Sequence, residues 1–243
     1  MFTGSFDGVG TFTQPFFGIT DPARMPPNRS ATEYINREGY WQRFLGFEMA
    51  ATKRLSNRWM GRFAFSVNDH REYFDSPEGI QNPTPTRASP NKHGGLVMRQ
   101  TGGSGKSGIF MLLPKYQFIV TGMYQAPWGI NLAANMLNRQ GYAMPYFHTN
   151  VPTGGSLLGP LQEVLLVDDV DQFRLPPVTS LDLRVGKEFA FARTRFNVDL
   201  DIFNALNANT ILGRQYDMRL TTRNNVLEIM NPRILRVGLR FGF

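Results

Sequence analysis

One segment of the sequence that could carry chemistry is a glycine-rich stretch containing a lysine. Residues 102–108 read Gly-Gly-Ser-Gly-Lys-Ser-Gly, which is close to a phosphate-binding loop. That loop also requires a glycine where this sequence has Gln100, and it connects a strand to a helix. The flanking sequence predicts neither a preceding strand nor a following helix. We therefore interpret 102–108 as a loop without a nucleotide site.

Closely spaced aspartates are the second group of candidate residues. The run at 168–171 (Asp-Asp-Val-Asp) lacks the glycine and the closing glutamate of a calcium-binding EF-hand, so we interpret it as a solvated loop. Asp199 and Asp201 share one face of a predicted strand, and Asp182 and Arg184 lie across a short turn from them. This arrangement predicts salt bridges between neighbouring strands rather than a catalytic pair of carboxylates.

Composition excludes several classes of function. The 243 residues include no cysteine, and the three histidines, His70, His93 and His148, are too scattered for a metal cage. No Ser-His-Asp arrangement is supported by spacing, so we predict no enzyme activity, no metal and no cofactor. The net charge is +7, but the basic residues form no run and no basic helix, so we do not expect a nucleic acid as partner.

The elements that position these residues are strands, because apolar and polar residues alternate along seven segments. The last segment is the clearest, since every second residue from Leu235 to Phe243 is apolar. The fold class that we predict is all-β. The predicted strands cover roughly 43–54, 58–68, 114–125, 129–140, 178–190, 195–205 and 233–243.

Connections between the predicted strands alternate in length. The links 69–113, 141–177 and 206–232 are long and rich in Pro, Gly and Asn, whereas the other connections are tight turns. Structureless loops longer than about 15 residues are unusual in compact soluble domains. Outer-membrane barrels have short periplasmic turns and long extracellular loops. The sequence therefore predicts an antiparallel transmembrane β-barrel segment, with the apolar face in lipid and the polar face on a wet lumen.

Two common membrane signals are missing from the sequence. No run of about 18 apolar residues predicts a transmembrane helix. Residues 1–30 lack the basic region and the apolar region of a secretion signal. A soluble lectin-like β-sandwich is therefore an alternative, and it predicts that the chain is soluble without detergent.

Aromatic residues beside the short turns predict contact with one membrane interface. Trp59, Trp128, Phe189 and Phe191 form the expected periplasmic aromatic girdle. Aromatics of a soluble β-sandwich core are the alternative interpretation. Lys187 falls in phase with the lipid-facing residues, so either its ammonium extends to the interface or a β-bulge changes the phase.

These strands resemble the C-terminal part of a TonB-dependent outer-membrane receptor barrel, of the Oar-like group with carboxypeptidase-regulatory-like N-terminal domains. The resemblance covers about Tyr40 to Phe243. It implies active uptake of a bulky nutrient, such as a metal chelate or a glycan. The residues that carry it are Gly46-Phe47-Glu48, 53–59 (Lys-Arg-Leu-Ser-Asn-Arg-Trp), 122–131 (Gly-Met-Tyr-Gln-Ala-Pro-Trp-Gly-Ile-Asn), 139–142 (Arg-Gln-Gly-Tyr), 182–187 (Asp-Leu-Arg-Val-Gly-Lys) and 199–207 (Asp-Leu-Asp-Ile-Phe-Asn-Ala-Leu-Asn).

The end of the chain is also similar to the signal that the outer-membrane barrel-assembly machinery recognises. Arg236, Gly238, Phe241 and Phe243 occupy its polar, glycine and aromatic positions. The resemblance implies three partners: outer-membrane lipid, the barrel-assembly machinery and, only through the missing N-terminal parts, the TonB energy-coupling complex. It also implies the outer membrane of a Gram-negative bacterium as the location.

The chain departs from the family in size, because such receptors have about 22 strands and a plug in the lumen. We therefore expect a fragment without plug, an incomplete barrel of the larger type. Residues 1–39 would be a partial extracellular loop or strand remnant, and 40–243 the C-terminal part of the barrel. The alternative is a self-contained eight-stranded outer-membrane barrel with a structural or adhesion role, in which residues 1–12 supply the eighth strand.

Overall fold

The computed structural model describes residues 1–6, 10–18, 20–21, 23, 36–80, 82–97, 114–151, 162–191 and 194–242. This part of the chain is all-β, with two single 3-10 turns, η2 (Pro77–Gly79) and η3 (Pro127–Gly129). The glycine-rich stretch 102–108 and the terminal residue Phe243 lie outside the described residues.

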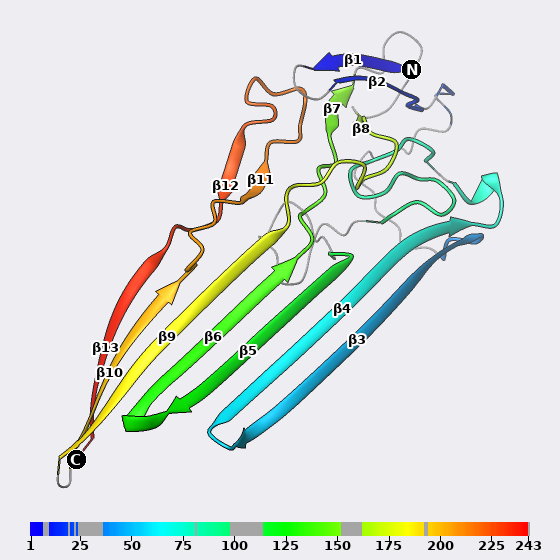
Figure 1. Ribbon diagram of the computed structural model, residues 1–243. Helices are drawn as coiled ribbons and strands as arrows, with labels where there is room; N and C mark the ends of the chain where they lie inside the picture. The colour runs from blue at the N-terminus through cyan, green and yellow to red at the C-terminus, as the bar shows by residue number, and fades with distance from the viewer. Residues whose placement is uncertain are drawn as a thin grey trace.

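One antiparallel sheet of seven strands dominates the molecule (Figure 1). From one edge to the other the strand order is β13-β10-β9-β6-β5-β4-β3. Each of these strands therefore pairs with the sheet strand that precedes it and the sheet strand that follows it in the sequence. The strands are β3 (Tyr40–Ser56), β4 (Trp59–Phe74), β5 (Tyr116–Ala126), β6 (Ile130–Arg139), β9 (Val178–Phe191), β10 (Thr194–Phe203) and β13 (Ile234–Gly242).

The seven predicted strands correspond one to one with the seven strands of this sheet. The all-β antiparallel prediction is therefore confirmed, and no closed barrel is formed by the described residues. The largest difference in a boundary is at β4, which continues to Phe74 and pairs there with Tyr40 of β3. The alternation of apolar residues ends earlier, at Val67, because Asp69 and Arg71 follow on the same face of the strand.

Cross-strand register brings the alternating apolar residues of all seven strands onto one face of the sheet, whereas a few, such as Phe44 and Met60, lie on the other. Each strand pair is antiparallel, and the register is regular except for a shift between Lys53 and Ser56 in the β3–β4 turn. A single row across six strands illustrates the result: Trp59, Tyr124, Leu132, Val185, Leu200 and Val237. We call this side the apolar face and the opposite side the polar face.

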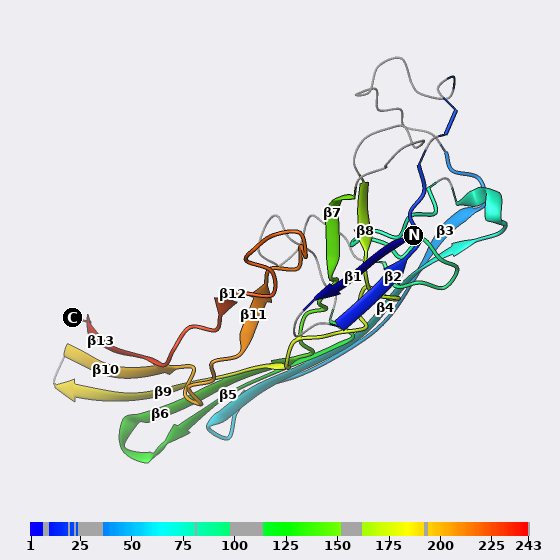
Figure 2. The ribbon, with the colours of Figure 1, turned by 90° about the horizontal axis from the view of Figure 1, so that it is seen from above.

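The sheet is curved, and the remaining elements lie on its concave side near one end (Figure 2). They are three short antiparallel hairpins, each paired only within itself in the described structure. The hairpins are β1 (Phe2–Phe6) with β2 (Gly10–Gln14), β7 (Phe147–Val151) with β8 (Gln162–Leu165), and β11 (Ile211–Arg214) with β12 (Val226–Ile229).

These hairpins correct two expectations. The described parts of the links 141–177 and 206–232 contain strands and are not structureless. Residues 1–12 do not add an eighth strand to the main sheet, because β1 pairs with β2 in a separate hairpin. The β1–β2 hairpin pairs residues at most 12 positions apart and so closes only a short loop. Closing this loop costs less conformational entropy than pairing β1 with an edge strand of the main sheet, β13 or β3.

The buried hydrophobic core lies in the linking segments and not under the sheet. We call the described parts of 82–97, 143–149, 163–175 and 214–219 the cap. Its core consists of Ala143, Tyr146, Phe147, Leu165, Leu166, Val167, Val170, Tyr216 and Met218. Backbone hydrogen bonds from Phe147 to Tyr216 (3.0 Å) and from Met218 to Phe147 (2.8 Å) join segments distant in sequence. The linking segments therefore form a packed unit at the end of the sheet opposite the short turns.

Candidate membrane-facing surface

The apolar face leaves large hydrophobic side chains exposed along the strands. Val237 is 68% exposed, Phe241 65% and Phe47 58%, although each is flanked by other apolar residues on its face. Further exposed members are Leu45, Met49, Trp59, Val67, Val120, Tyr124, Leu132, Val185, Leu200, Leu235 and Leu239. Contiguous apolar patches on soluble monomers are seldom larger than a few hundred Å². A patch that extends over seven strands therefore has to be covered, either by an apolar solvent such as lipid or by a protein partner.

Charged residues occur on the apolar face only near its two ends. At the end with the short turns they are Lys53 and Lys187, and at the cap end they are Arg43, Asp69 and Arg71. Between these limits the register places no Asp, Glu, Lys or Arg of the seven strands on this face. Near the cap end of β6 and β9, Asn138 donates a hydrogen bond to Thr179 Oγ1 (2.7 Å). The face therefore has an uncharged middle and polar boundaries.

The four predicted girdle residues all lie at the end of the sheet with the short turns. Phe189 stacks on Phe196 at 6.0 Å between ring centroids, and Phe196 contacts Phe241 at 4.8 Å. Phe191 lies one step nearer the turn, on the same face, and is exposed. Phe196 was missed as a site residue, although its alternation with Val198 and Leu200 already placed it on the apolar face.

Trp128 has the most unusual geometry of these aromatics. It lies in the β5–β6 turn with φ +61°, a left-handed conformation that bulky residues seldom adopt. Its side chain is 83% exposed, so packing within the described chain does not stabilise the strained backbone. An indole held out from a turn in this way is suited to an interface between water and lipid headgroups.

Lys187 retains the phase that places it on the apolar face. The register between β9 and β10 is continuous through Lys187, which excludes the bulge considered as one explanation. Its ammonium instead donates a hydrogen bond to the backbone oxygen of Trp128 in the turn. The long side chain thus carries its charge to the end of the apolar face, as the alternative explanation required.

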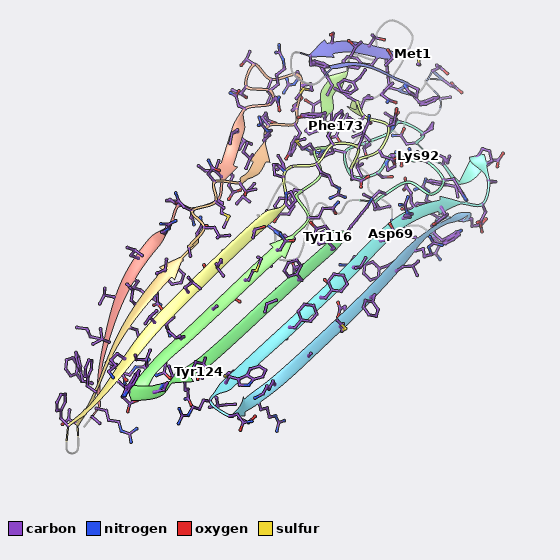
Figure 3. The ribbon with its side chains drawn as sticks, in the orientation of Figure 1. Met1, Asp69, Lys92, Tyr116, Tyr124 and Phe173 are labelled. Carbon is purple, nitrogen blue, oxygen red and sulfur yellow. The ribbon has the colours of Figure 1, made fainter. Side chains whose placement is uncertain are left out.

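A second group of aromatic residues lies toward the cap end of the apolar face. Trp41 stacks on Tyr73 at 4.2 Å between ring centroids, and its indole donates a hydrogen bond to Asp75 (2.9 Å). Tyr116 begins β5 at this end, whereas Tyr124 lies near the opposite end of the same strand (Figure 3). The alternation in the sequence could have revealed this second group, because Trp41 and Tyr73 are in phase with Phe47 and Val67.

The polar face is held together by an ion-pair cluster on three strands. Asp201 of β10 is only 5% exposed and lies between Arg184 of β9 and Arg236 of β13. Its carboxylate accepts hydrogen bonds from Arg184 Nη2 (3.1 Å) and from Arg236 Nη2 (2.7 Å) and Nε (2.9 Å). The predicted salt bridge between Arg184 and Asp201 is confirmed. Asp182 is engaged differently, because it accepts the backbone N–H of Asn204 (2.9 Å).

Residues of the predicted assembly signal divide between the two faces of β13. Arg236 and Gly238 lie on the polar face and Phe241 lies on the apolar face. Gly238 is opposite Asp199, which is itself opposite Gly186 on the next strand. A Cβ at Gly186 would collide with the Asp199 carboxylate, whereas a Cβ at Gly238 would make an ordinary contact of 3.7 Å. A side chain at position 186 therefore requires the Asp199 carboxylate to move, whereas one at position 238 does not.

The aspartate run at 168–171 is more than a solvated loop, because it is engaged by Lys92 and Lys115 from other segments and by Arg174 from its own. Asp171 is paired with Lys115 (3.0 Å) and Arg174 (2.9 Å), and Asp169 is paired with Lys92 (2.9 Å). Burial alone would raise the pKa of Asp171, but the hydrogen bonds from Arg174 and Lys115 outweigh it and hold the pKa below its ordinary value. These pairs fasten the cap to the start of β5.

The net pKa shift has the opposite direction at Glu163 in the cap, because burial there outweighs the favourable interactions. Burial raises the pKa of Glu163, although the backbone and the guanidinium of Arg87 both favour the charged form. The Arg87–Glu163 ion pair is 2.9 Å long.

Figure 3 shows Lys92 and Phe173 among the cap segments, away from the short turns. The cap is thus a separate polar and apolar unit that does not extend over the apolar face.

Among the residues that the structure describes, no group of His, Asp and Glu side chains is arranged to hold a metal ion. Within the same residues, no helix is long and apolar enough to cross a membrane. Comparison of the sequence with protein-family models and with curated proteins gives no match.

Proposed function

We propose that the seven-stranded sheet is part of the wall of an outer-membrane β-barrel in a Gram-negative bacterium. The observation that carries the proposal is that large hydrophobic side chains are exposed on one face of the sheet, whereas a soluble protein would bury them. The buried core lies in the cap, while the strands present outward an apolar face whose middle is uncharged. In a soluble sandwich this face would be covered by a second sheet, and the described hairpins lie on the other side.

Strand lengths are consistent with this proposal. A transmembrane β-strand needs about 9–11 residues when it is tilted. The seven strands range from 9 residues in β13 to 17 residues in β3. Aromatic side chains lie toward both ends of the apolar face, which is the usual position of the two interfacial girdles. The short turns would then face the periplasm and the cap would face the outside.

We further propose that the barrel belongs to a transporter similar to TonB-dependent receptors, with uptake of a bulky nutrient as its activity. The sequence resemblance supports this step, and the polar concave face is suited to a hydrated lumen. The edge strands β3 and β13 each have one side without a strand partner in the described structure. Lipid does not tolerate open sheet edges, so the proposed wall requires further strands beside them.

The absence of cysteine from the chain makes a direct test of the wall possible. Val120→Cys and Thr121→Cys are neighbours on β5 that point to the apolar face and the polar face, respectively. In outer-membrane vesicles of cells producing the chain with a secretion leader, we expect a water-soluble maleimide to label T121C and not V120C. After solubilisation in denaturant both should react. Equal labelling of the two in the membrane, or recovery of the chain as a soluble monomer, would contradict the proposal.

A further inference from the structure

Three arginines at the β3–β4 turn have no partner among the described residues. Arg54 and Arg62 lie on the polar face, because each follows a residue of the apolar face, Lys53 or Gly61. Arg58 lies in the turn itself, with φ +67°. All three are exposed, and no described residue forms a hydrogen bond or ion pair with their guanidinium groups. The cap and the hairpins lie toward the other end of this concave side, so the arginines face open space (Figure 2).

The nearest carboxylates of the polar face are too distant to neutralise Arg62. Residues 49–68, β5 and β6 contain no Asp or Glu. Glu48 is opposite Ser66, which places it about 13 Å along β4 from Arg62. Asp182 is in the same cross-strand row as Arg62 but three strands away, or about 14 Å. The positive charge at this turn is therefore not balanced by a carboxylate of the main sheet.

Hydrogen-bond donors continue from Arg62 across the neighbouring strands. One row of cross-strand partners on the polar face contains, in order, Thr52, Arg62, Thr121 and Asn135. Thr121 donates a hydrogen bond to Asn135 Oδ1 (2.9 Å), and the amide nitrogen of Asn135 has no acceptor among the described residues. Guanidinium, hydroxyl and amide groups in one row can donate to the oxygens of a carboxylate or a phosphate. The row is therefore suited to an anionic group.

Apolar side chains lie beside this row of donors on the same face. Toward the short turns, Met60 is opposite Met123. Toward the cap, the next row of cross-strand partners is Ala50, Ala64, Ile119 and Leu137. The small side chains of Ala50 and Ala64 leave space beside Arg62 for the body of a ligand. The surface thus combines a cationic row with an apolar row, and an anion with an apolar body matches this pattern.

From this placement we infer that the polar face binds an organic anion with an apolar body. Its carboxylate or phosphate lies at Arg54 and Arg62, and its apolar body lies on Ala50 and Ala64. The inference rests on the proposed function, because that function places this face in the lumen and the site then makes the transported nutrient an anion. A lipid headgroup is excluded as the occupant, since the register directs Arg54 and Arg62 away from the apolar face. Rings of Arg or Lys select anions in pores for the same electrostatic reason.

Protection of a cysteine reporter tests the inference, because the chain has no cysteine of its own. Ala50→Cys places an exposed thiol in the apolar row, and Arg240→Cys places one on the polar face of β13, at the opposite edge of the sheet. The full chain in open outer-membrane fragments is treated with the neutral reagent N-ethylmaleimide at constant ionic strength. The probe is benzene-1,3,5-tricarboxylate. We expect it to slow the reaction of A50C and to leave that of R240C unchanged.

Variants of the arginines and a second probe separate the two parts of the site. In the A50C background, Arg62→Gln should weaken the apparent affinity for the tricarboxylate about fivefold, and Arg62→Lys should retain most of it. Arg54→Gln should act in the same direction. Arg223→Gln is the matched control and should have no effect, because Arg223 is an exposed arginine outside the main sheet that also has no partner among the described residues. Citrate, which carries three carboxylates but no ring, should protect A50C less than the aromatic probe.

The outcomes distinguish this inference from the proposed function. If A50C reacts in the membrane at the same rate with and without the tricarboxylate, the anion site is wrong while the proposed wall is unaffected. Equal protection of A50C and R240C, or a loss of protection in R223Q as large as that in R62Q, would overturn the assignment to Arg54 and Arg62. Equal protection by citrate would overturn the role of the apolar row. If A50C is unreactive in the membrane and reacts only in denaturant, the polar face is not in water and both proposals fail.

Discussion

Asp201 and Arg236 join β10 to β13, with both Nε and Nη2 of the arginine donating hydrogen bonds to one carboxylate oxygen, at 2.9 and 2.7 Å. Arg236 therefore has a structural partner in addition to its predicted place in an assembly signal. The same carboxylate neutralises Arg184 on the other side, so it lies between two guanidinium groups. Loss of this one carboxylate would leave the guanidinium groups of Arg184 and Arg236 facing each other across β10.

The first prediction concerns this cluster. Asp201→Asn should lower the unfolding temperature of the chain in detergent, because two arginines lose their shared anion. Asp199→Asn serves as a matched control on the same strand and face, because the Asp199 side chain forms no hydrogen bond or ion pair with a described residue. Thermal unfolding followed by circular dichroism compares the two variants. A shift for D199N as large as that for D201N would show that the cluster has no special role.

The second prediction separates packing from assembly at the two glycines beside Asp199. Gly186→Ala should destabilise the sheet by about 1 kcal/mol, the lower end of the usual cost of overpacking, because its Cβ is accommodated only when the Asp199 carboxylate turns away. Gly238→Ala should change the stability little, because the added methyl has room. If Gly238 is nevertheless part of an assembly signal, G238A should reduce insertion into the outer membrane in cells. G186A, compared at the same expression level, should not reduce insertion. Unchanged insertion of G238A would count against the signal.

The third prediction concerns the strained tryptophan. Trp128→Gly should stabilise the fold in detergent by roughly 1 kcal/mol, since glycine adopts a positive φ without steric cost. The same change should weaken binding to phospholipid vesicles, because the exposed indole would no longer insert at the interface. Chemical denaturation and vesicle flotation measure the two effects. A variant that loses stability would contradict the strain argument, and one that floats as well as the parent would show that Trp128 is not an interfacial anchor.

Much of the main sheet could be predicted from the sequence because apolar and polar residues alternate along each strand. Strands that follow one another in the sequence then pair with each other. The alternation places Phe189 and Val237 on one face without knowledge of the fold. The extension of β4 to Phe74 could not be predicted in this way, since Asp69 and Arg71 interrupt the apolar pattern. Those residues remain in the strand because β3 continues beside them and supplies backbone partners.

The cap could not be predicted because its stability comes from contacts between distant segments. Asp171 in the sequence is one residue of an acidic run, and its partner Lys115 lies directly before β5, distant in the sequence. One local signal was available, namely the continuous apolar run from Val164 to Val167, which is typical of a buried strand. The Arg58 position illustrates a different limit, because only the backbone conformation reveals that a residue other than glycine occupies a left-handed turn.

The last prediction is a pH dependence of the cap. Because the folded pKa of Asp171 is below its ordinary value of 3.8, its contribution to stability is present above that value and is lost as the pH falls through the folded pKa. Hydrogen exchange of the cap amides should therefore become faster, relative to that of the strands and after correction for intrinsic rates, as the pH falls below 3.8. Glu163 acts in the opposite direction, since its raised pKa favours the folded cap at low pH and disfavours it as the pH rises. The variant Asp171→Asn should remove the acid-dependent increase while leaving the Glu163 effect. An increase of equal size in D171N would assign the acid sensitivity to other groups.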